Sequence, residues 1–232
     1  HPGPTAKQIA TLDLLSKGRF VFGLGVGGEF ESDFNVAGIP ITERGGRLTE
    51  SIEVMRKLWS GQSVSYDGKY FQFEEILMEP QPYQLGGPPI WVGGRSDAAL
   101  RRAAQMGDGW MSYVVTPDMY RESLDKIEVE YERSGRVIQQ FVSAHLLFTR
   151  LDKDYETALN TATESLSIRY GMDFRRAAER YCALGTADQV AEKLQKFYEA
   201  GVRYVILDLV GPYEERLDHL AGFADEVLPL LG

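Results

Sequence analysis

A glycine turn followed by a polar pair has the residue types and spacing that can hold a phosphate group. Gly93 and Gly94 follow a short apolar run, and Arg95 and Ser96 precede an alanine-rich segment. This order predicts a strand, a turn and a helix. The first N–H groups of a helix have no partner within the helix and attract anions. The turn can therefore bind a phosphorylated cofactor, although Ser96 as an ordinary helix N-cap explains the same residues.

A second group that could do chemistry is the carboxylate of Glu29. It directly follows Gly27 and Gly28, at the predicted carboxyl end of an apolar strand. A buried carboxylate at such a place can act as a general acid or orient a substrate. The alternative is a solvated loop carboxylate, which is common in an acidic chain. Ser32 and Asp33 are weaker candidates for the same side of the predicted site.

Charged residues at the start of a long predicted helix are better explained by structure than by chemistry. Glu43, Arg44 and Arg47 fall in or next to its first turn, where an acidic group suits the helix dipole and salt bridges form. Arg44 could in addition brace the loop that carries Glu29. Asp108 lies between two glycines, where an aspartate typically bonds nearby main-chain N–H groups.

The remaining ionisable candidates do not predict a metal site. His145 alternates within an apolar strand, His219 lies on an amphipathic helix, and neither has a partner at ligand spacing. Cys182 is the single cysteine, which excludes an internal disulfide and suits a reducing cytoplasm. We expect this thiol to be buried and inert.

Composition excludes several classes of protein. The chain has 232 residues, is 44% hydrophobic and carries a net charge of −9, with its basic residues scattered. These features indicate a globular protein and argue against nucleic-acid and membrane partners. No apolar run has membrane-span length, and no signal-peptide layout is present. The opening His1-Pro2-Gly3-Pro4 indicates an expression scar or a start inside a longer protein.

Helix and strand signals alternate along the chain, which predicts parallel strands. The interval 62–87 interrupts this rhythm and predicts an inserted hairpin around Asp67-Gly68. We expect helices at 5–16, 43–59, 96–106, 117–133, 154–181 with a break near Gly171, 187–200 and 213–230. We expect core strands at 19–26, 90–93, 109–114, 141–149 and 203–210.

Two architectures accommodate these five strands. One is an open doubly wound sheet. The other is a (β/α)8 barrel of which only the last five units are present. The three units missing from such a barrel would amount to roughly 90 residues. The pattern of elements does not choose between the two.

An ordered set of motifs gives the chain a family resemblance. It resembles the bacterial luciferase-like monooxygenase superfamily, and within it the branch of F420-dependent oxidoreductases. The ordered set over residues 6–110 is specific, and the resemblance beyond it is looser. The motifs are residues 6–19, Gly23-Leu24-Gly25-Val26-Gly27, Glu43-Arg44-Gly45 with Arg47-Leu48, Leu58-Trp59-Ser60-Gly61, Pro80-Gln81-Pro82, Pro89-Ile90-Trp91-Val92-Gly93-Gly94 and Gly107-Asp108-Gly109-Trp110.

The resemblance implies one TIM-barrel domain over residues 1–232, with an insertion at about 62–87 and the first three β-strands missing. Members of the family commonly form homodimers. It further implies that Glu29 is catalytic and that Trp110 lines the pocket near the cofactor ring. The cofactor-binding residues that it implies are Gly27, Gly93, Gly94, Arg95, Ser96 and Trp110.

The leading hypothesis is an F420-dependent oxidoreductase that transfers a hydride between the deazaflavin and a small organic substrate. An FMN-dependent luciferase-like monooxygenase is the first alternative, because FMN needs the same phosphate site. Arg95, Arg101 and Arg102 suit either cofactor. The second alternative is a truncated, catalytically inactive flavin-binding barrel, since a barrel without three strands exposes unpaired edges.

Overall fold

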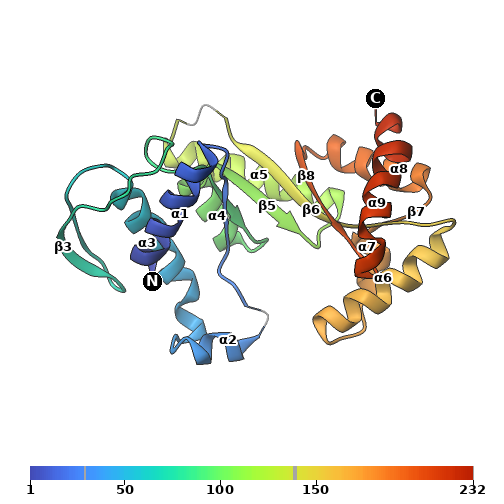
Figure 1. Ribbon diagram of the computed structural model, residues 1–232, viewed down its shortest axis with the longest axis horizontal. Coiled ribbons are helices and arrows are strands. Elements are labelled where there is room, and N and C mark those ends of the chain that lie inside the picture. Colours follow the sequence, from blue (N-terminus) through green and yellow to red (C-terminus); the bar gives the residue numbers. More distant parts are fainter. Residues whose placement is uncertain (29, 138–139, 232) are drawn as a thin grey trace. The chain divides into compact units, whose positions relative to one another are not determined.

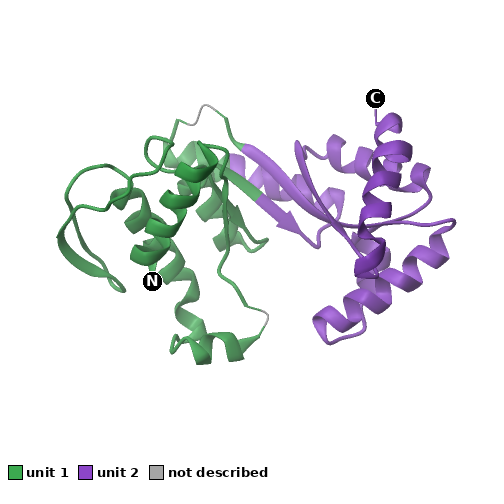
Figure 2. Cartoon of the chain, in the orientation of Figure 1, with its two compact units in different colours: residues 1–110, 129–141 green, residues 111–128, 142–232 purple. Residues whose placement is uncertain are grey.

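The computed structural model describes residues 1–28, 30–137 and 140–231, which adopt an α/β fold (Figure 1). Contacts divide the chain into two compact units (Figure 2). Unit 1 contains residues 1–110 and 129–141, and unit 2 contains residues 111–128 and 142–232. Strand β5 (Gly109–Tyr113) begins in unit 1 and ends in unit 2.

The sheet of unit 1 is built on two parallel strands. Strand β1 (Phe22–Leu24) pairs with β4 (Ile90–Gly93), and Leu24 lies opposite Val92. Three successive residues of β4 are buried, as expected for a parallel strand with both faces covered. The helical elements of this unit are α1 (Pro2–Ser16), α2 (Glu31–Val36), η1 (Ile41–Glu43), α3 (Arg44–Leu58) and α4 (Asp97–Met106).

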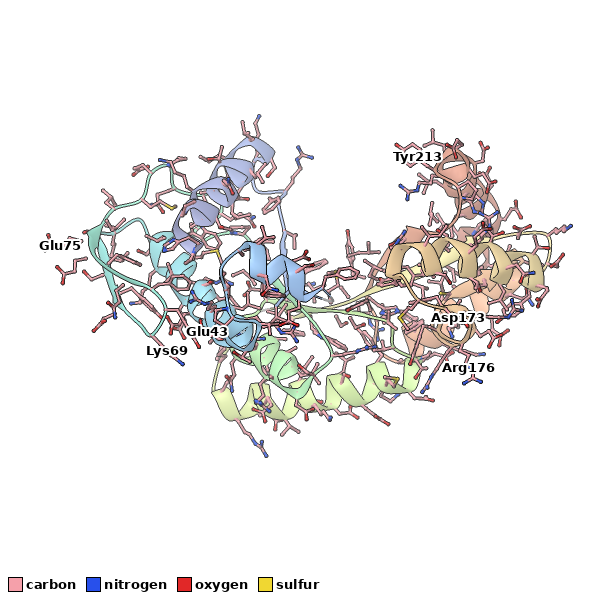
Figure 3. All side chains as sticks on the ribbon, turned by 90° about the horizontal axis from the view of Figure 1, so that it is seen from below. Glu43, Lys69, Glu75, Asp173, Arg176 and Tyr213 are labelled. Atoms are coloured by element: carbon pink, nitrogen blue, oxygen red, sulfur yellow. The ribbon has the colours of Figure 1, made fainter. Side chains whose placement is uncertain are left out.

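A hairpin forms where the sequence predicts an insertion. Strands β2 (Val64–Asp67) and β3 (Gln72–Ile76) are antiparallel, and the rings of Tyr66 and Phe73 stack with centroids 6.1 Å apart. Figure 3 labels Lys69 and Glu75 on this hairpin. The hairpin confirms the prediction that this interval departs from the α/β alternation.

Unit 2 is built around the long strand β6 (Val142–Leu151). It pairs in parallel with β7 (Ala183–Gly185) and with β8 (Tyr204–Leu209). The apolar core of this unit includes Phe148, Leu166 and Phe174. The helical elements after β5 are α5 (Pro117–Ser134), α6 (Tyr155–Tyr170), α7 (Arg175–Tyr181), α8 (Ala187–Glu199), η2 (Tyr213–Glu215), α9 (Arg216–Gly222), η3 (Phe223–Val227) and η4 (Leu228–Leu230).

Local capping signals set several helix ends at their predicted places. Thr186 and Gln189 form a capping box, in which the Thr186 N–H donates to the Gln189 side chain at 3.0 Å. Gly171 adopts a φ of 65° and separates α6 from α7. Each of the five predicted strands is present, and the pairings β1–β4 and β6–β8 are parallel as predicted.

Three boundaries differ from the prediction. Strand β1 covers three residues instead of 19–26, and α1 begins at Pro2 instead of residue 5, although it ends at Ser16 as predicted. The single helix predicted over 213–230 is wrong, because it divides into η2, α9, the π-helical turn η3 and η4. Pro229 lies in the last of these, and a proline has no N–H with which to continue the α-helical bonding.

Candidate cofactor-binding site

The glycine turn predicted to hold a phosphate lies between β4 and α4, at the carboxyl end of the strand. Gly94 has a φ of 119°, a conformation that glycine adopts without the usual steric cost. A Cβ atom on Gly94 would also lie 2.8 Å from the Cβ of Ala99. Arg95 and Ser96 are exposed. The turn therefore presents a guanidinium group and a helix N-terminus to solvent.

Ser96 is the N-cap of α4. Its hydroxyl accepts a hydrogen bond from the N–H of Ala99 at 3.3 Å, and its carbonyl accepts one from Leu100 at 3.0 Å. Asp97 places a carboxylate in the first turn, which partly offsets the attraction of this end for an anion. Capping does not exclude phosphate binding, because one cap satisfies one of several N–H groups at a helix end.

Trp110 is tied directly to the glycine turn. Its indole Nε1 donates a hydrogen bond to the carbonyl oxygen of Gly94 at 2.7 Å, and its side chain is buried. Sequence reasoning placed Trp110 near the cofactor ring. The structure brings it to the turn predicted to hold the phosphate.

The loop that contains Gly27 follows the neighbouring strand at the same end of the sheet. Because β1 and β4 are parallel with Leu24 opposite Val92, the loop after β1 and the turn after β4 leave the same edge. Gly27 and Gly28 have φ values of 72° and 73°. Glu29 lies outside the described residues, so its catalytic role stays a prediction.

Arg44 braces this loop, as the sequence indicates. Its Nη1 donates to the carbonyl of Gly28 at 3.1 Å, and its guanidinium lies 5.9 Å from the ring centroid of Phe34. The ring packs so closely that a Cβ on Gly28 would lie 2.1 Å from Phe34 Cε2. The loop conformation therefore depends on contacts from α2 and α3. Ser32 and Asp33 lie on α2 and are exposed.

A cavity of about 640 Å³ adjoins the loop within unit 1, in the size range of small-molecule sites. Its walls are strand β1, the two residues that follow it (25 and 26), and side chains from α1, α2 and α3. Arg44 and Arg47 contribute its charge, and the described residues that line it include no carboxylate. Arg47 pairs with Glu43 at 2.8 Å and lies 4.9 Å from the ring centroid of Tyr70. Figure 3 labels Glu43, the last residue of η1, which directly precedes α3.

Asp108 has a structural role, although its partners are more distant than the sequence predicts. Its Oδ2 accepts a hydrogen bond from the N–H of Ile90 at 2.8 Å and pairs with the guanidinium of Arg56. Arg136 lies 3.8 Å from Oδ1 and also donates to the carbonyl of Gly107. Asp108 therefore joins α3, the start of β4 and the turn before β5.

Arg101 and Arg102 differ in their surroundings. Arg101 is exposed on α4, whereas Arg102 is buried, with Nε donating to Thr49 at 3.1 Å and Nη2 to the carbonyl of Gly45 at 3.0 Å. Burial lowers the pKa of Arg102 below its usual value, with a further contribution from Arg101. Arg102 thus joins α4 to the first turns of α3.

The histidines and the cysteine occupy packed positions. His145 is buried, stacks on Phe197 with centroids 4.2 Å apart, and lies 2.7 Å from the Ser112 hydroxyl. Burial is the main cause that lowers its pKa to about 4. Burial raises the pKa of the Cys182 thiol to about 12, which keeps it protonated and unreactive. Within residues 1–28, 30–137 and 140–231 no group of three or more His, Cys, Asp or Glu could hold a metal ion.

Sequence reasoning missed a charged cluster in unit 2. The buried guanidinium of Arg150 contacts Asp152 at 3.2 Å and Glu215 at 2.9 Å. His219 Nε2 lies 3.7 Å from the same Glu215 carboxylate. The one local signal was an arginine at the end of an apolar strand, two residues before an aspartate. Glu215 and His219 are too far along the chain to be recognised as partners from spacing.

No helix in the described part of the chain combines the length and apolar character needed to cross a membrane.

Comparison with known sequences establishes the family. A sequence model of the luciferase-like monooxygenase family matches residues 1–204. The chain belongs to this family, whose members are oxidoreductases and monooxygenases, and it is an enzyme of that class. The resemblance carried by the motifs of residues 6–110 is thereby confirmed.

Individual relatives include an F420-dependent dehydrogenase and a monooxygenase. The F420-dependent glucose-6-phosphate dehydrogenase of Microbacterium testaceum (strain StLB037) is 27% identical over 256 residues, spanning 100% of this chain and 74% of the relative. A monooxygenase of Streptomyces bottropensis superposes with a TM-score of 0.84 at 26% identity, covering 100% of this chain and 75% of that one.

A further solved structure shows likeness of fold. An F420-dependent secondary alcohol dehydrogenase in complex with an F420-acetone adduct has a TM-score of 0.84 at 20% identity, and it covers 100% of this chain and 76% of that one. The α/β fold of the chain thus matches that of solved members of the family, which supports the barrel over the doubly wound alternative.

Proposed function

We propose that this protein is an F420-dependent oxidoreductase that transfers a hydride between the deazaflavin and a small organic substrate. The observation that carries the proposal is the turn after β4, with Gly94 at a φ of 119°, an exposed Arg95 and the N-terminus of α4. The names of the relatives support F420 as the cofactor. The place of Glu29 in the sequence, directly after Gly27 and Gly28, supports a catalytic role for it, either as a general acid or in orienting the substrate.

The residues of the turn suit the phosphate end of such a cofactor. Main-chain N–H groups at the start of α4 and the Arg95 guanidinium supply donors of the right charge. Gly93, Gly94 and Ser96 complete this proposed phosphate site, and Gly27 lies on the neighbouring loop at the same sheet edge. When bound, the deazaflavin supplies the hydride chemistry. The chain binds and orients it, and Trp110 fixes the turn.

An FMN-dependent monooxygenase is the second candidate. The Streptomyces bottropensis monooxygenase, at 26% identity and a TM-score of 0.84, favours it. The same turn suits the phosphate of FMN. The side-chain geometry of the turn does not separate the two cofactors, because each carries a phosphate that needs N–H donors and a cation. They differ beyond the phosphate, where F420 has a long acidic tail that requires a basic groove and FMN has none.

The proposal extends to the organisation of the protein. We infer a single luciferase-like barrel domain with the hairpin of β2 and β3 as its insertion, working as a cytoplasmic homodimer. A truncated, inactive barrel is the third candidate and makes a distinct prediction, namely cofactor binding without turnover.

Titration of the purified protein with F420 and, separately, with FMN tests the proposal by absorbance and fluorescence. We expect saturable binding of F420 and turnover of F420 with a panel of small alcohols, aldehydes and enones. Tight FMN binding with no response to F420 would overturn the F420 assignment in favour of the second candidate. Binding of F420 without turnover over a broad panel would support the third.

A further inference from the structure

The hydrogen bond between Trp110 and Gly94 fixes one peptide unit of the turn. Trp110 is the second residue of β5 and Gly94 directly follows β4, and the indole Nε1 lies 2.7 Å from the Gly94 carbonyl oxygen. The Trp110 side chain is buried, whereas Arg95 and Ser96 are exposed. The carbonyl of Gly94 therefore points toward the interior of unit 1.

The direction of this carbonyl sets the direction of an N–H group. The C=O of Gly94 and the N–H of Arg95 belong to one planar peptide unit, and the peptide is trans, so the two groups point in opposite directions. With the carbonyl held toward the buried indole, the Arg95 N–H points away from it. The side chains of Arg95 and Ser96, which follow this peptide, are exposed.

Other contacts of the turn also restrict the orientation of the Gly94–Arg95 peptide. Gly94 has a φ of 119°, and a Cβ atom on Gly94 would lie only 2.8 Å from the Cβ of Ala99. Helix α4 thus packs against Gly94 through Ala99, and Trp110 bonds to the Gly94 carbonyl oxygen. A peptide flip at this position would break the indole bond and leave a buried N–H donor without its acceptor, which is costly.

We propose that Trp110 is a positioning residue for the phosphate of the cofactor, acting through the Gly94–Arg95 peptide and not through the cofactor ring. The indole holds the peptide in the one orientation that directs the Arg95 N–H toward a bound phosphate. The inference rests on the proposed function, because it takes the turn after β4 as the phosphate site. Trp110 therefore contributes to affinity for the phosphate.

The test compares ligands that differ by the phosphate end. FMN and riboflavin form one pair, and the deazaflavin riboside of F420 with and without its 5′-phosphate forms the other. The variant is Trp110→Phe, which removes the indole N–H. The matched control is Trp59→Phe, because Trp59 is equally buried in unit 1 and its Nε1 donates to the carbonyl of Ala6 at 3.0 Å, away from the turn.

Dissociation constants are measured by fluorescence quenching on the full chain. We expect Trp110→Phe to weaken binding of the phosphate-bearing member of the pair by about tenfold, the size of one lost charge-assisted hydrogen bond. Binding of the phosphate-free member should change by less than about twofold. Trp59→Phe should leave the ratio between the two ligands unchanged. A second form, with Trp110 replaced by benzothienylalanine, keeps the two-ring shape without the donor and should reproduce the effect.

Each outcome decides the proposal. Equal weakening of both ligands in Trp110→Phe, or an unchanged ratio in the benzothienylalanine form, would show a purely structural role and overturn the inference. The proposed function would survive that result, provided that the unaltered protein prefers the phosphate-bearing ligand. If the unaltered protein shows no such preference for either pair, the phosphate site after β4 is wrong, and the inference fails with it.

Discussion

The Ser112 hydroxyl lies 2.7 Å from Nδ1 of His145, and both side chains are buried in unit 2. His145 also stacks on Phe197 and meets the ring of Tyr120 edge to face, with centroids 5.9 Å apart. Nε2 of His145 is buried with no hydrogen-bond partner among the described residues. The imidazole is therefore packed as a neutral ring, and one more proton would place an unpaired charge in an apolar cluster.

This packing predicts acid sensitivity of the fold. The pKa of His145 falls to about 4, chiefly through burial, from an ordinary value of 6.5 in the unfolded chain. Between these two values the unfolded state binds a proton that the folded state does not. Stability is therefore fully present above pH 6.5 and is lost as the pH falls toward 4, by about 3 kcal/mol at most.

Urea unfolding at pH 7.5, 5.5 and 4.5 measures this loss. The variant His145→Asn keeps a polar partner for Ser112 but does not titrate. We expect the free energy of unfolding of this variant to decrease less steeply with falling pH than that of the unaltered protein. The two slopes should differ by the contribution of about one proton. Parallel pH profiles for the two proteins would contradict this account of His145.

The partners of Asp108 predict a structural loss away from the cofactor site. Asp108→Asn keeps an acceptor for the Ile90 N–H but removes the charge that faces Arg56 and Arg136. Since these groups are about two-thirds or more covered, we expect the free energy of unfolding to fall by about 1–3 kcal/mol. Urea unfolding measures it.

The matched control is the exposed pair of Glu192 and Lys196 on α8. Its side chains are 66% and 56% exposed, so Glu192→Gln should leave stability unchanged. Equal effects of the two substitutions would show that the Asp108 network contributes no more than an ordinary surface ion pair.

Elements were predictable where local signals define them. The apolar run and glycines predict β4 and the turn after it, and Ser96 caps α4 at the expected residue. Strand β7 was missed because its three residues, Ala183–Gly185, are too short to show a period and gain their place only by pairing with the end of β6. Helix α2 has no buried residue and so carries no apolar stripe.

The sequence predicted which residues form the candidate site better than it predicted the contacts between them. The turn of Gly93 to Ser96 follows from local chemistry, and its link to a cofactor came from the family resemblance. That Trp110 bonds to Gly94, or that Asp108 meets Arg56 and Arg136, depends on chain segments 16 to 52 residues apart. Such pairings are set by strand order and helix packing, and sequence spacing does not encode them.

Substitutions at two adjacent glycines allow the stability cost of backbone strain to be measured separately from the cost of steric overlap. Gly86 has a φ of 79° with open space where a Cβ would be, whereas Gly87 has a φ of 99° and a Cβ there would lie 2.1 Å from Trp59 Cε3. We expect Gly86→Ala to cost about 1 kcal/mol through strain. Gly87→Ala should cost about 2–4 kcal/mol, because the buried indole must also move.

Urea or thermal unfolding of the two variants provides the comparison, with each variant serving as the control for the other. Similar losses for both would mean that Trp59 moves aside at little cost. The packing of this indole against the glycine pair would then be looser than its 1% exposure indicates.

Arg95 places a positive charge at the turn after β4. Its side chain is exposed beside the N-terminus of α4, where a bound phosphate would meet both the guanidinium and the main-chain N–H groups. Arg95→Gln should weaken binding of F420 or FMN by about tenfold at low salt. Because the pair is exposed, this difference should shrink as the ionic strength rises.

Arg101→Gln is the control, since Arg101 is exposed on the same helix beyond its first turn. Titrations at low and high salt distinguish the two arginines. A loss in Arg95→Gln that is independent of salt, or matched by Arg101→Gln, would mean that Arg95 does not contact the phosphate. Affinity would then depend on the main-chain donors of the turn, which neither substitution removes.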